Sequence, residues 1–187
     1  GSSSVNGMVY VRGDRSDFDH WAQLGNRGWS FEDCLPYFKK SESFEANGGS
    51  ARGHSGPLRV TRRGVVHPYA KAFYDACRQY GLEDNQDFNG GGDQEGVGPT
   101  DSTMAENKRW SSSRAFLWPA LSRPNLRVLT KSHATKVIFD GKKAVAVEYV
   151  SRGTTRRIRA TREVILCGGA VNSPQLLQLS GVGDPAH

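Results

Sequence analysis

Cysteine is scarce in this chain, and the three that occur (Cys34, Cys77 and Cys167) lie far apart in the sequence. Their number is odd and no CxxC pair is present, which argues against a disulfide framework and a cysteine-ligated metal site. We therefore expect reduced thiols and no bound metal. No apolar run approaches the roughly 18–20 residues that cross a bilayer, and no signal peptide is recognisable. These absences favour a cytoplasmic protein without a transmembrane segment. They leave open that an intact, longer protein associates with a membrane.

An excess of acidic residues is also missing. The chain has 25 Lys and Arg against 19 Asp and Glu, a net charge of +6. The basic residues are scattered, with short clusters at residues 62–63 and 152–159, and they form no stripe joined to a recognised nucleic-acid-binding module. We therefore predict a solvated basic face and no nucleic-acid partner. A weak attraction to phosphate-bearing ligands or acidic lipid surfaces stays compatible with this charge.

A length of 187 residues suits one large domain or two small ones. Helical patterns and loops come first, and period-two strand patterns follow from Asn125, so the order is α+β in appearance and ends as α/β. The expected N-caps of the first two helices are Ser16 and Ser30, and Asp140-Gly141 signals a hairpin. The expected helices cover residues 16–24, 30–40, 67–80 and 111–121, and the expected strands cover residues 57–60, 126–130, 135–139, 144–150 and 156–160.

Residues 45–56 (EANGGSARGHSG) are polar and rich in glycine. This composition is typical of a surface loop. We expect the loop to be exposed and to be the place where the chain could hinge.

The stretch REVILCGGAVNSPQLLQLSGVG at residues 162–183 has the pattern of a strand, a glycine turn and a helix. Residues 164–166 predict a short strand buried on both faces. Asn172 or Ser173 is the expected helix cap, Pro174 fits the first position, and Gly181 ends the helix. Backbone N–H groups at such a helix start bind anionic ligands. An ordinary βα unit without a ligand explains the same pattern.

The first thirteen residues, GSSSVNGMVYVRG, begin with small side chains. Such residues let the backbone approach a flat or phosphorylated ligand closely, because no bulky side chain intervenes. On its own this is a weak signal.

Taken together, four stretches resemble the glucose–methanol–choline (GMC) family of FAD-dependent oxidoreductases. GSSSVNGMVYVRGDRSDFDHWA resembles the second half of the family's first signature, and LGNRGWSFEDCLPYFKKSES resembles the segment after it. The stretch from SSSRAFLWPAL to AVAVEYV resembles the path toward the adenine end of the flavin. GGAVNSPQLLQLSGVG resembles the second signature. The resemblance extends over essentially the whole chain.

The resemblance implies an α/β fold with α+β character, made of part of a Rossmann-like FAD-binding domain and part of a substrate-side domain. Residues 1–55 would carry the flavin-contact segment and the helices after it. Residues 56–107 would belong to the substrate-side region, where substrate choice resides. Residues 108–187 would return to the FAD-binding domain.

The resemblance also implies a set of cofactor contacts. The backbone at residues 6–9 and the Asn6 side chain would lie beside the flavin ring, and Val137 would offer its main chain to adenine. Some members attach FAD covalently through a His where this chain has Val5, so the resemblance implies non-covalent FAD. The implied cofactor-binding residues are Ser2, Ser3, Asn6, Gly7, Met8, Val9, Val137, Gly168, Gly169 and Ala170.

Two family motifs find no counterpart in this sequence. The GxGxxG fingerprint would lie before Gly1, and the catalytic His with its partner would lie after His187, so the resemblance implies an internal part of a longer enzyme. We assign no catalytic residue, and expect the five histidines to be structural or solvent-exposed. The strand expected at residues 164–166 would then lack the neighbouring strands that pair with it.

The implied activity is oxidation of a primary alcohol (choline-like, aryl or aliphatic) to the aldehyde, by hydride transfer to flavin N5. Its partners would be the small-molecule alcohol and an electron acceptor, oxygen or quinone-like, that the sequence does not identify. Two other functions stay open. One is a nucleotide- or flavin-binding module without catalysis, and the other is a basic interaction protein, which steep salt dependence of binding would indicate.

Overall fold

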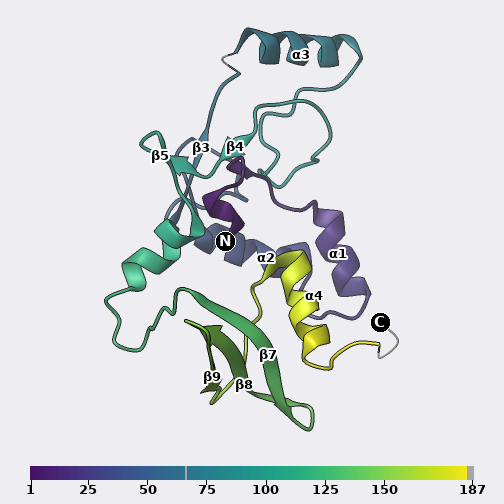
Figure 1. Cartoon of the computed structure of the whole chain (residues 1–187). Coiled ribbons are helices and arrows are strands. Elements are labelled where there is room, and N and C mark those ends of the chain that lie inside the picture. The colour runs from purple at the N-terminus through teal and green to yellow at the C-terminus, as the bar shows by residue number, and fades with distance from the viewer. Residues whose placement is uncertain (66, 185–187) are drawn as a thin grey trace. The chain divides into compact units, whose positions relative to one another are not determined.

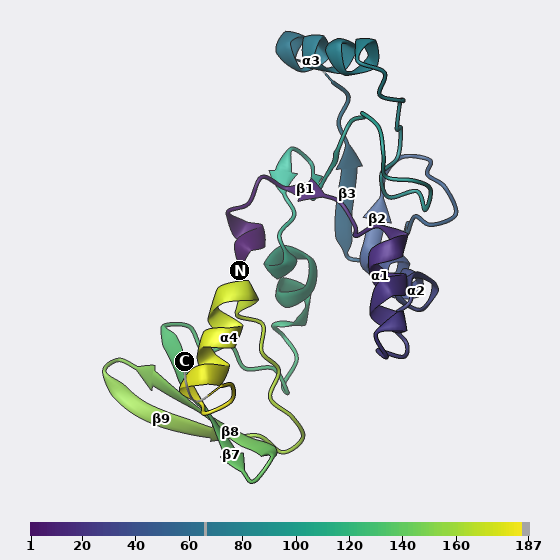
Figure 2. The same cartoon turned by 90° about the vertical axis from the view of Figure 1, so that its right-hand side faces the viewer.

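The computed structural model describes residues 1–65 and 67–184. The chain divides into two compact units, Gly1–Arg123 and Pro124–His187, and both contain helices and strands (Figures 1 and 2). The expected mixture of helix and sheet is present in both.

The first two helices of the N-terminal unit are α1 (Arg15–Gln23) and α2 (Phe31–Ser41). Ser30 caps α2 as predicted, and its side chain and that of Asp33 form a reciprocal capping box. The predicted cap of α1 was wrong. Asp14 caps that helix, because its carboxylate accepts the Ser16 N–H at 2.8 Å while Asp17 reaches back to the Asp14 N–H. A carboxylate two residues earlier satisfies the free N–H groups better than the Ser16 hydroxyl.

Helix α1 is expected to weaken in acid through its cap. The hydrogen bonds from Ser16 hold the pKa of the Asp14 carboxyl below its ordinary value of 3.8. Because this pKa is lower in the folded state, the ionised Asp14 carboxylate stabilises the fold at pH values above 3.8. The contribution is lost as the pH falls through the lower pKa of the folded state. Asp14→Asn keeps a capping acceptor without the charge, so helix content followed by circular dichroism should depend less on pH below 3.8. An unchanged acid response would contradict this role.

A small mixed sheet forms the centre of the N-terminal unit, with the order β1-β4-β3-β2. Strand β1 (Val9–Tyr10) pairs antiparallel with β4 (Asp101–Ser102), and β4 pairs antiparallel with β3 (Leu58–Arg62). Strand β2 (Glu42–Phe44) runs parallel to β3. The strand predicted at residues 57–60 is therefore confirmed. The pairing of β1 with β4 places Val9 and Tyr10 beside residues some ninety positions later in the chain.

Most of the loop after β2 is exposed as predicted, but residues 51–53 are buried. Ala51 and Arg52 are 4% and 2% exposed. The Arg52 guanidinium lies within 2.9 Å of the carboxylates of Glu42, Asp87 and Asp101. A buried cation with three carboxylate partners ties the loop to the sheet, which polar composition alone could not indicate.

Two further helical segments complete the N-terminal unit. The helix predicted at residues 67–80 is confirmed as α3 (Pro68–Gln79), with His67 as its N-cap, but its aromatic residues Tyr69 and Phe73 are 82% and 70% exposed. The helix expected at residues 111–121 is divided into a π-helical turn, η2 (Ser113–Leu117), and a 3₁₀ turn, η3 (Trp118–Ala120). Pro119 lies in the second turn, where its missing N–H prevents continuous α-helical hydrogen bonding.

The C-terminal unit is built on an antiparallel meander. Strands β7 (Ser132–Asp140), β8 (Lys143–Ser151) and β9 (Thr154–Arg159) pair in order. The predicted hairpin is confirmed, with Gly141 at φ 57° in its turn. The predicted strand at residues 126–130 is not formed, because no described strand pairs with it.

Helix α4 (Gly169–Leu179) packs on β7. It begins at Gly169, earlier than the predicted cap at Asn172 or Ser173, so Pro174 lies inside the helix. The predicted end at Gly181 is confirmed, with φ 85° at this glycine. The Ser180 hydroxyl accepts the Val137 N–H at 2.8 Å and donates to the Leu176 carbonyl, which joins the end of α4 to β7.

The strand predicted at residues 164–166 is also absent, and Ile165 is 73% exposed. A short apolar run becomes a strand only when neighbouring strands accept and donate its backbone hydrogen bonds. No described strand is hydrogen-bonded to residues 164–166. The apolar pattern is therefore present without the ladder that would bury it.

Candidate functional site

The predicted flavin-contact residues of the N-terminal unit form one short, exposed segment. It begins with the 3₁₀ turn η1 (Ser2–Ser4) and leads into β1. Met8 has φ 65°, a conformation that non-glycine residues adopt only when their surroundings hold them there. The Asn6 side chain supports this backbone, because its Oδ1 accepts the Met8 N–H at 3.1 Å. The segment is thus a preformed backbone path.

A hairpin from much later in the chain holds this segment. Strands β5 (Met104–Ala105) and β6 (Lys108–Arg109) pair through a tight turn. Just before β5, the Thr103 N–H and hydroxyl donate to the Met8 carbonyl at 2.8 and 3.2 Å. The Arg109 Nη1 donates to Asn6 Oδ1 at 2.7 Å and to the Ser3 carbonyl at 3.1 Å.

Sequence reasoning missed the role of this hairpin. The signal available was the pair Glu106-Asn107, whose φ values of 51° and 57° are those of a two-residue hairpin turn. Asn is common at such positions, but Glu is not. The contact of Arg109 with residues a hundred positions earlier had no sequence signal.

Beneath the segment, a network of charged residues fixes the strand that follows it. Arg12 is 6% exposed and donates to the Glu42 carboxylate and the Ala51 carbonyl. Asn89 accepts the Arg12 N–H at 2.8 Å and donates to the Tyr10 carbonyl. Burial raises the pKa of the Tyr10 hydroxyl, against the opposing effect of its hydrogen bond from Arg12. These contacts tie β1 to the rest of the N-terminal unit, so the exposed residues before it start from a fixed strand.

The chemistry of the N-terminal segment fits a flavin. A Cβ built on Gly7 meets no atom within 4 Å, so open space lies beside the backbone. Within the described part of the chain, the Gly7 N–H and the Asn6 side-chain amine have no hydrogen-bond partner. Unpaired donors beside open space suit the oxygen- and nitrogen-rich edges of an isoalloxazine ring.

In the C-terminal unit, Gly168, Gly169 and Ala170 lie at the start of α4. The Gly168 N–H is used internally, since it donates to the Ser173 hydroxyl at 2.9 Å. Gly169 has φ 87°, and a Cβ there would meet no atom within 4 Å. The first N–H groups of a helix have no intrahelical acceptor. This turn therefore keeps the donors and the space that an anionic group requires.

Val137 lies near the other end of the same helix. It is 2% exposed, and its N–H is already bonded to Ser180. Val137 bonds Ser180, which follows α4 and lies twelve positions after Gly168, so the two places are about 18 Å apart along the helix. The predicted residues thus form one group in the N-terminal unit and two separate places in the C-terminal unit.

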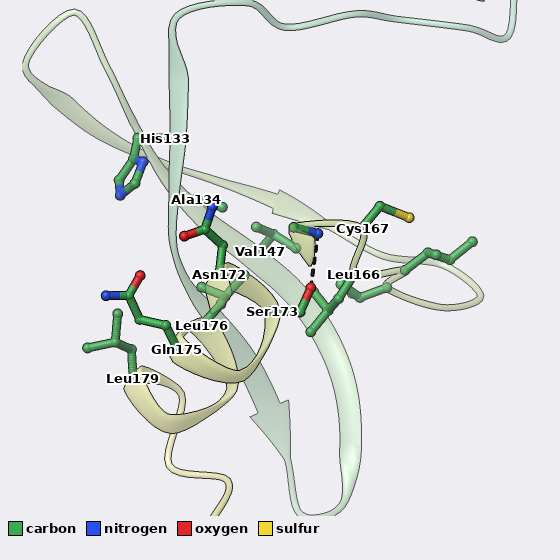
Figure 3. A pocket seen from close by; sticks show the side chains of 13 residues that line it. His133, Ala134, Val147, Leu166, Cys167, Asn172, Ser173, Gln175, Leu176 and Leu179 are labelled. Atoms are coloured by element: carbon green, nitrogen blue, oxygen red, sulfur yellow. Dashed lines mark hydrogen bonds between the residues drawn. The ribbon is translucent and has the colours of Figure 1, made fainter. Parts of the chain in front are cut away.

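A pocket of about 350 Å³ lies within the C-terminal unit, beside the Gly168 turn. Its lining combines the apolar side chains of Leu166 and Leu176 with polar ones. Figure 3 shows Asn172 and Gln175 projecting from α4 on the side where His133 lies. Gly168 is the one predicted cofactor residue in this lining.

Two of the histidines have structural partners. The His54 Nδ1 lies 3.1 Å from the Phe44 carbonyl, and the His67 Nδ1 accepts the Tyr69 N–H as a helix cap. His187 lies outside the described residues. Among residues 1–65 and 67–184, no group of three or more His, Cys, Asp or Glu side chains could hold a metal ion. No helix in that same part of the chain combines the length and apolar character needed to cross a membrane.

Curated relatives match along nearly the full chain. The human mitochondrial choline dehydrogenase is 50% identical over 184 residues, which cover 98% of this chain and 31% of that protein. The oxygen-dependent choline dehydrogenase of Brucella ovis is 49% identical over 187 residues, covering 100% and 34% respectively. The chain therefore spans about one third of the length of these relatives.

Solved structures agree with this relationship. The pyridoxine 4-oxidase from Mesorbium loti superposes with a TM-score of 0.89 at 34% identity, over 98% of this chain and 36% of that one. An FAD-dependent oxidoreductase from Chaetomium thermophilum gives 0.89 at 35% identity, over 98% and 34%. These similarities confirm the expected mixed helix and sheet fold and FAD as the cofactor. The sequence model of the GMC oxidoreductase family also matches residues 1–187. The chain therefore belongs to the GMC oxidoreductase family.

Proposed function

We propose that this chain supplies flavin contacts to an enzyme that oxidises a primary alcohol to the aldehyde, with choline as the first candidate substrate. The observation that carries the proposal is the N-terminal segment, where the Gly7 N–H and the Asn6 amine are unpaired beside open space. The relatives named choline dehydrogenase, near 50% identity, support choline over other alcohols.

FAD, when bound, would supply a flavin ring that accepts a hydride from the carbinol carbon. The residues of this chain would hold the cofactor without a covalent link, because Val5 offers no nucleophile. Asn6, Gly7, Met8 and Val9 would line the flavin ring, with Ser2 and Ser3 near its phosphate and ribitol region. Catalysis by such residues consists of positioning and electrostatic tuning.

The C-terminal residues suit the nucleotide part of an elongated cofactor. The donors at the start of α4, with Gly168, Gly169 and Ala170, favour a phosphate. Val137 lies at the far end of that helix and would contact adenine through its main chain. Because its N–H already donates to Ser180, its carbonyl is the group we expect adenine to use. Residues 56–107 would contribute to the substrate side.

The proposal is tested in a full-length protein. That protein contains residues 1–187 together with the segments that correspond to the other two thirds of the relatives. We expect it to purify with FAD that acid or heat releases, and choline to bleach the flavin absorbance under anaerobic conditions. Benzyl alcohol and ethanol serve as the aryl and aliphatic comparisons. Bound FAD that no alcohol reduces would favour a non-catalytic flavin-binding module, and absence of FAD binding would overturn the proposal.

Oxygen is the first candidate for the electron acceptor, with a quinone-like molecule as the alternative. Admitting oxygen to the choline-reduced protein separates the two cases. Rapid recovery of flavin absorbance would indicate oxygen as acceptor, in line with the oxygen-dependent choline dehydrogenase of Brucella ovis. Recovery only with an added quinone would indicate a dehydrogenase.

A further inference from the structure

We propose that Arg109 is a positioning residue that fixes which half of the Asn6 amide is presented to the flavin. The inference rests on the proposed function, because it concerns the same N-terminal segment. The contact joins residues 103 positions apart.

The acceptor atom of the Asn6 side chain is its carbonyl oxygen. Two donors converge on one side-chain atom, the Met8 N–H at 3.1 Å and the Arg109 Nη1 at 2.7 Å. Neither a backbone N–H nor a guanidinium can accept a hydrogen bond. The atom that both approach is therefore the carbonyl oxygen Oδ1, and a flipped amide would place two donors against a third.

With Oδ1 bonded twice, the amine Nδ2 is the half of Asn6 that remains unpaired within the described part of the chain. Asn6 lies on the exposed surface of its segment, so this amine is accessible to a ligand. Asn6 therefore presents a donor to the flavin, where a free amide could present either a donor or an acceptor.

Arg109 is held in place by its hairpin. Its strand β6 pairs with β5, where Arg109 lies opposite Met104. The same hairpin is bonded to the segment, because the Trp110 N–H donates to the Thr103 carbonyl and the Thr103 N–H donates to the Met8 carbonyl. The Arg109 Nη1 also donates to the Ser3 carbonyl at 3.1 Å. The guanidinium thus comes from an element already fixed to the residues it orients.

The test compares variants of the full-length protein by FAD titration of the apoprotein and by the midpoint potential of the bound flavin. Arg109→Met keeps the side-chain volume and removes the donors. We expect FAD binding about tenfold weaker, from loss of one charge-assisted hydrogen bond. We also expect a lower midpoint potential, because a donor facing the ring stabilises the reduced, electron-rich flavin. Arg109→Lys retains a donating cation and should recover most of both properties.

The matched control is Arg114→Met. The Arg114 guanidinium stacks over the Trp110 ring, 4.3 Å from its centroid, and donates no hydrogen bond to residues 1–9, all of which the structure describes. We expect FAD binding within about twofold of the parent. If Arg109→Met behaves like Arg114→Met, the positioning role is overturned. If the parent binds no FAD, the proposed function falls and this inference falls with it.

A double-mutant cycle separates positioning from general stabilisation. If Arg109 acts through Asn6, the double variant Asn6→Ala with Arg109→Met should bind FAD about as tightly as the weaker single variant. Effects that multiply would contradict the inference. Should Arg109→Met fail to fold, Asn6→Asp still decides the question. It keeps an oxygen for both donors but replaces the outward amine by an acceptor, so FAD binding near the parent value would overturn the proposal.

Discussion

Replacing Gly7 with valine is expected to weaken FAD binding by the full-length protein roughly 10- to 100-fold, the equivalent of about 1–3 kcal/mol of overpacking. A Cβ at this position meets no atom of the chain within 4 Å, and Gly7 is not among the glycines with positive φ. The backbone therefore tolerates a side chain, and folding should change little. The added atoms would occupy space that we assign to the cofactor.

The control for this variant is Gly64→Val. Gly64 also has open space around its added Cβ and no positive φ, but it belongs to none of the predicted cofactor contacts. We expect its FAD titration and thermal midpoint to match the parent protein. Equal FAD affinity for the two valine variants would contradict the assignment of residues 6–9 to the flavin.

Replacing Arg52 with methionine is expected to destabilise the N-terminal unit by about 3–5 kcal/mol, the cost of breaking a buried ion pair by removing one partner. The Arg52 side chain is fully buried and lies 2.7–2.9 Å from Glu42, Asp87 and Asp101. Methionine fills the space of the aliphatic stem but leaves buried negative charge without its cation.

Urea unfolding followed by tryptophan fluorescence measures this loss in the chain of residues 1–187, because its four tryptophans (Trp21, Trp29, Trp110 and Trp118) all lie in the N-terminal unit. The control is Arg59→Met. The Arg59–Glu45 pair is 43% and 38% exposed, and an exposed pair contributes less than about 1 kcal/mol. If Arg52→Met costs no more than Arg59→Met, the loop after β2 is not held by this network.

The elements that sequence reasoning predicted well depend on local signals. The Ser30 capping box starts α2, and Gly141 forms the tight turn between β7 and β8. In each case the residues that decide the structure lie within four positions of one another. The error at α1 was equally local, since Asp14 and Ser16 are both good caps and competed for one helix start.

The errors with larger consequences concern contacts between distant residues. Polar composition predicted an exposed loop at residues 45–56, yet Arg52 is buried because carboxylates from three other places in the chain surround it. The apolar run at residues 164–166 predicted a strand, yet no described strand pairs with it. Composition reports what a segment prefers, whereas burial and strand pairing depend on partners that the segment does not contain.

By itself the sequence determined the family, the cofactor and the candidate residues, because spaced motifs such as SSSVNG and GGAVNSPQLL are local patterns that a resemblance can identify. Only the tertiary structure decided which of those residues share a surface, which donors are already used, as at Val137, and which remain unpaired, as at Asn6. It also brought Arg109 to the N-terminal segment. The physical reason is that a hydrogen bond depends on distance and direction in space, and residues 103 positions apart acquire both only when the chain folds.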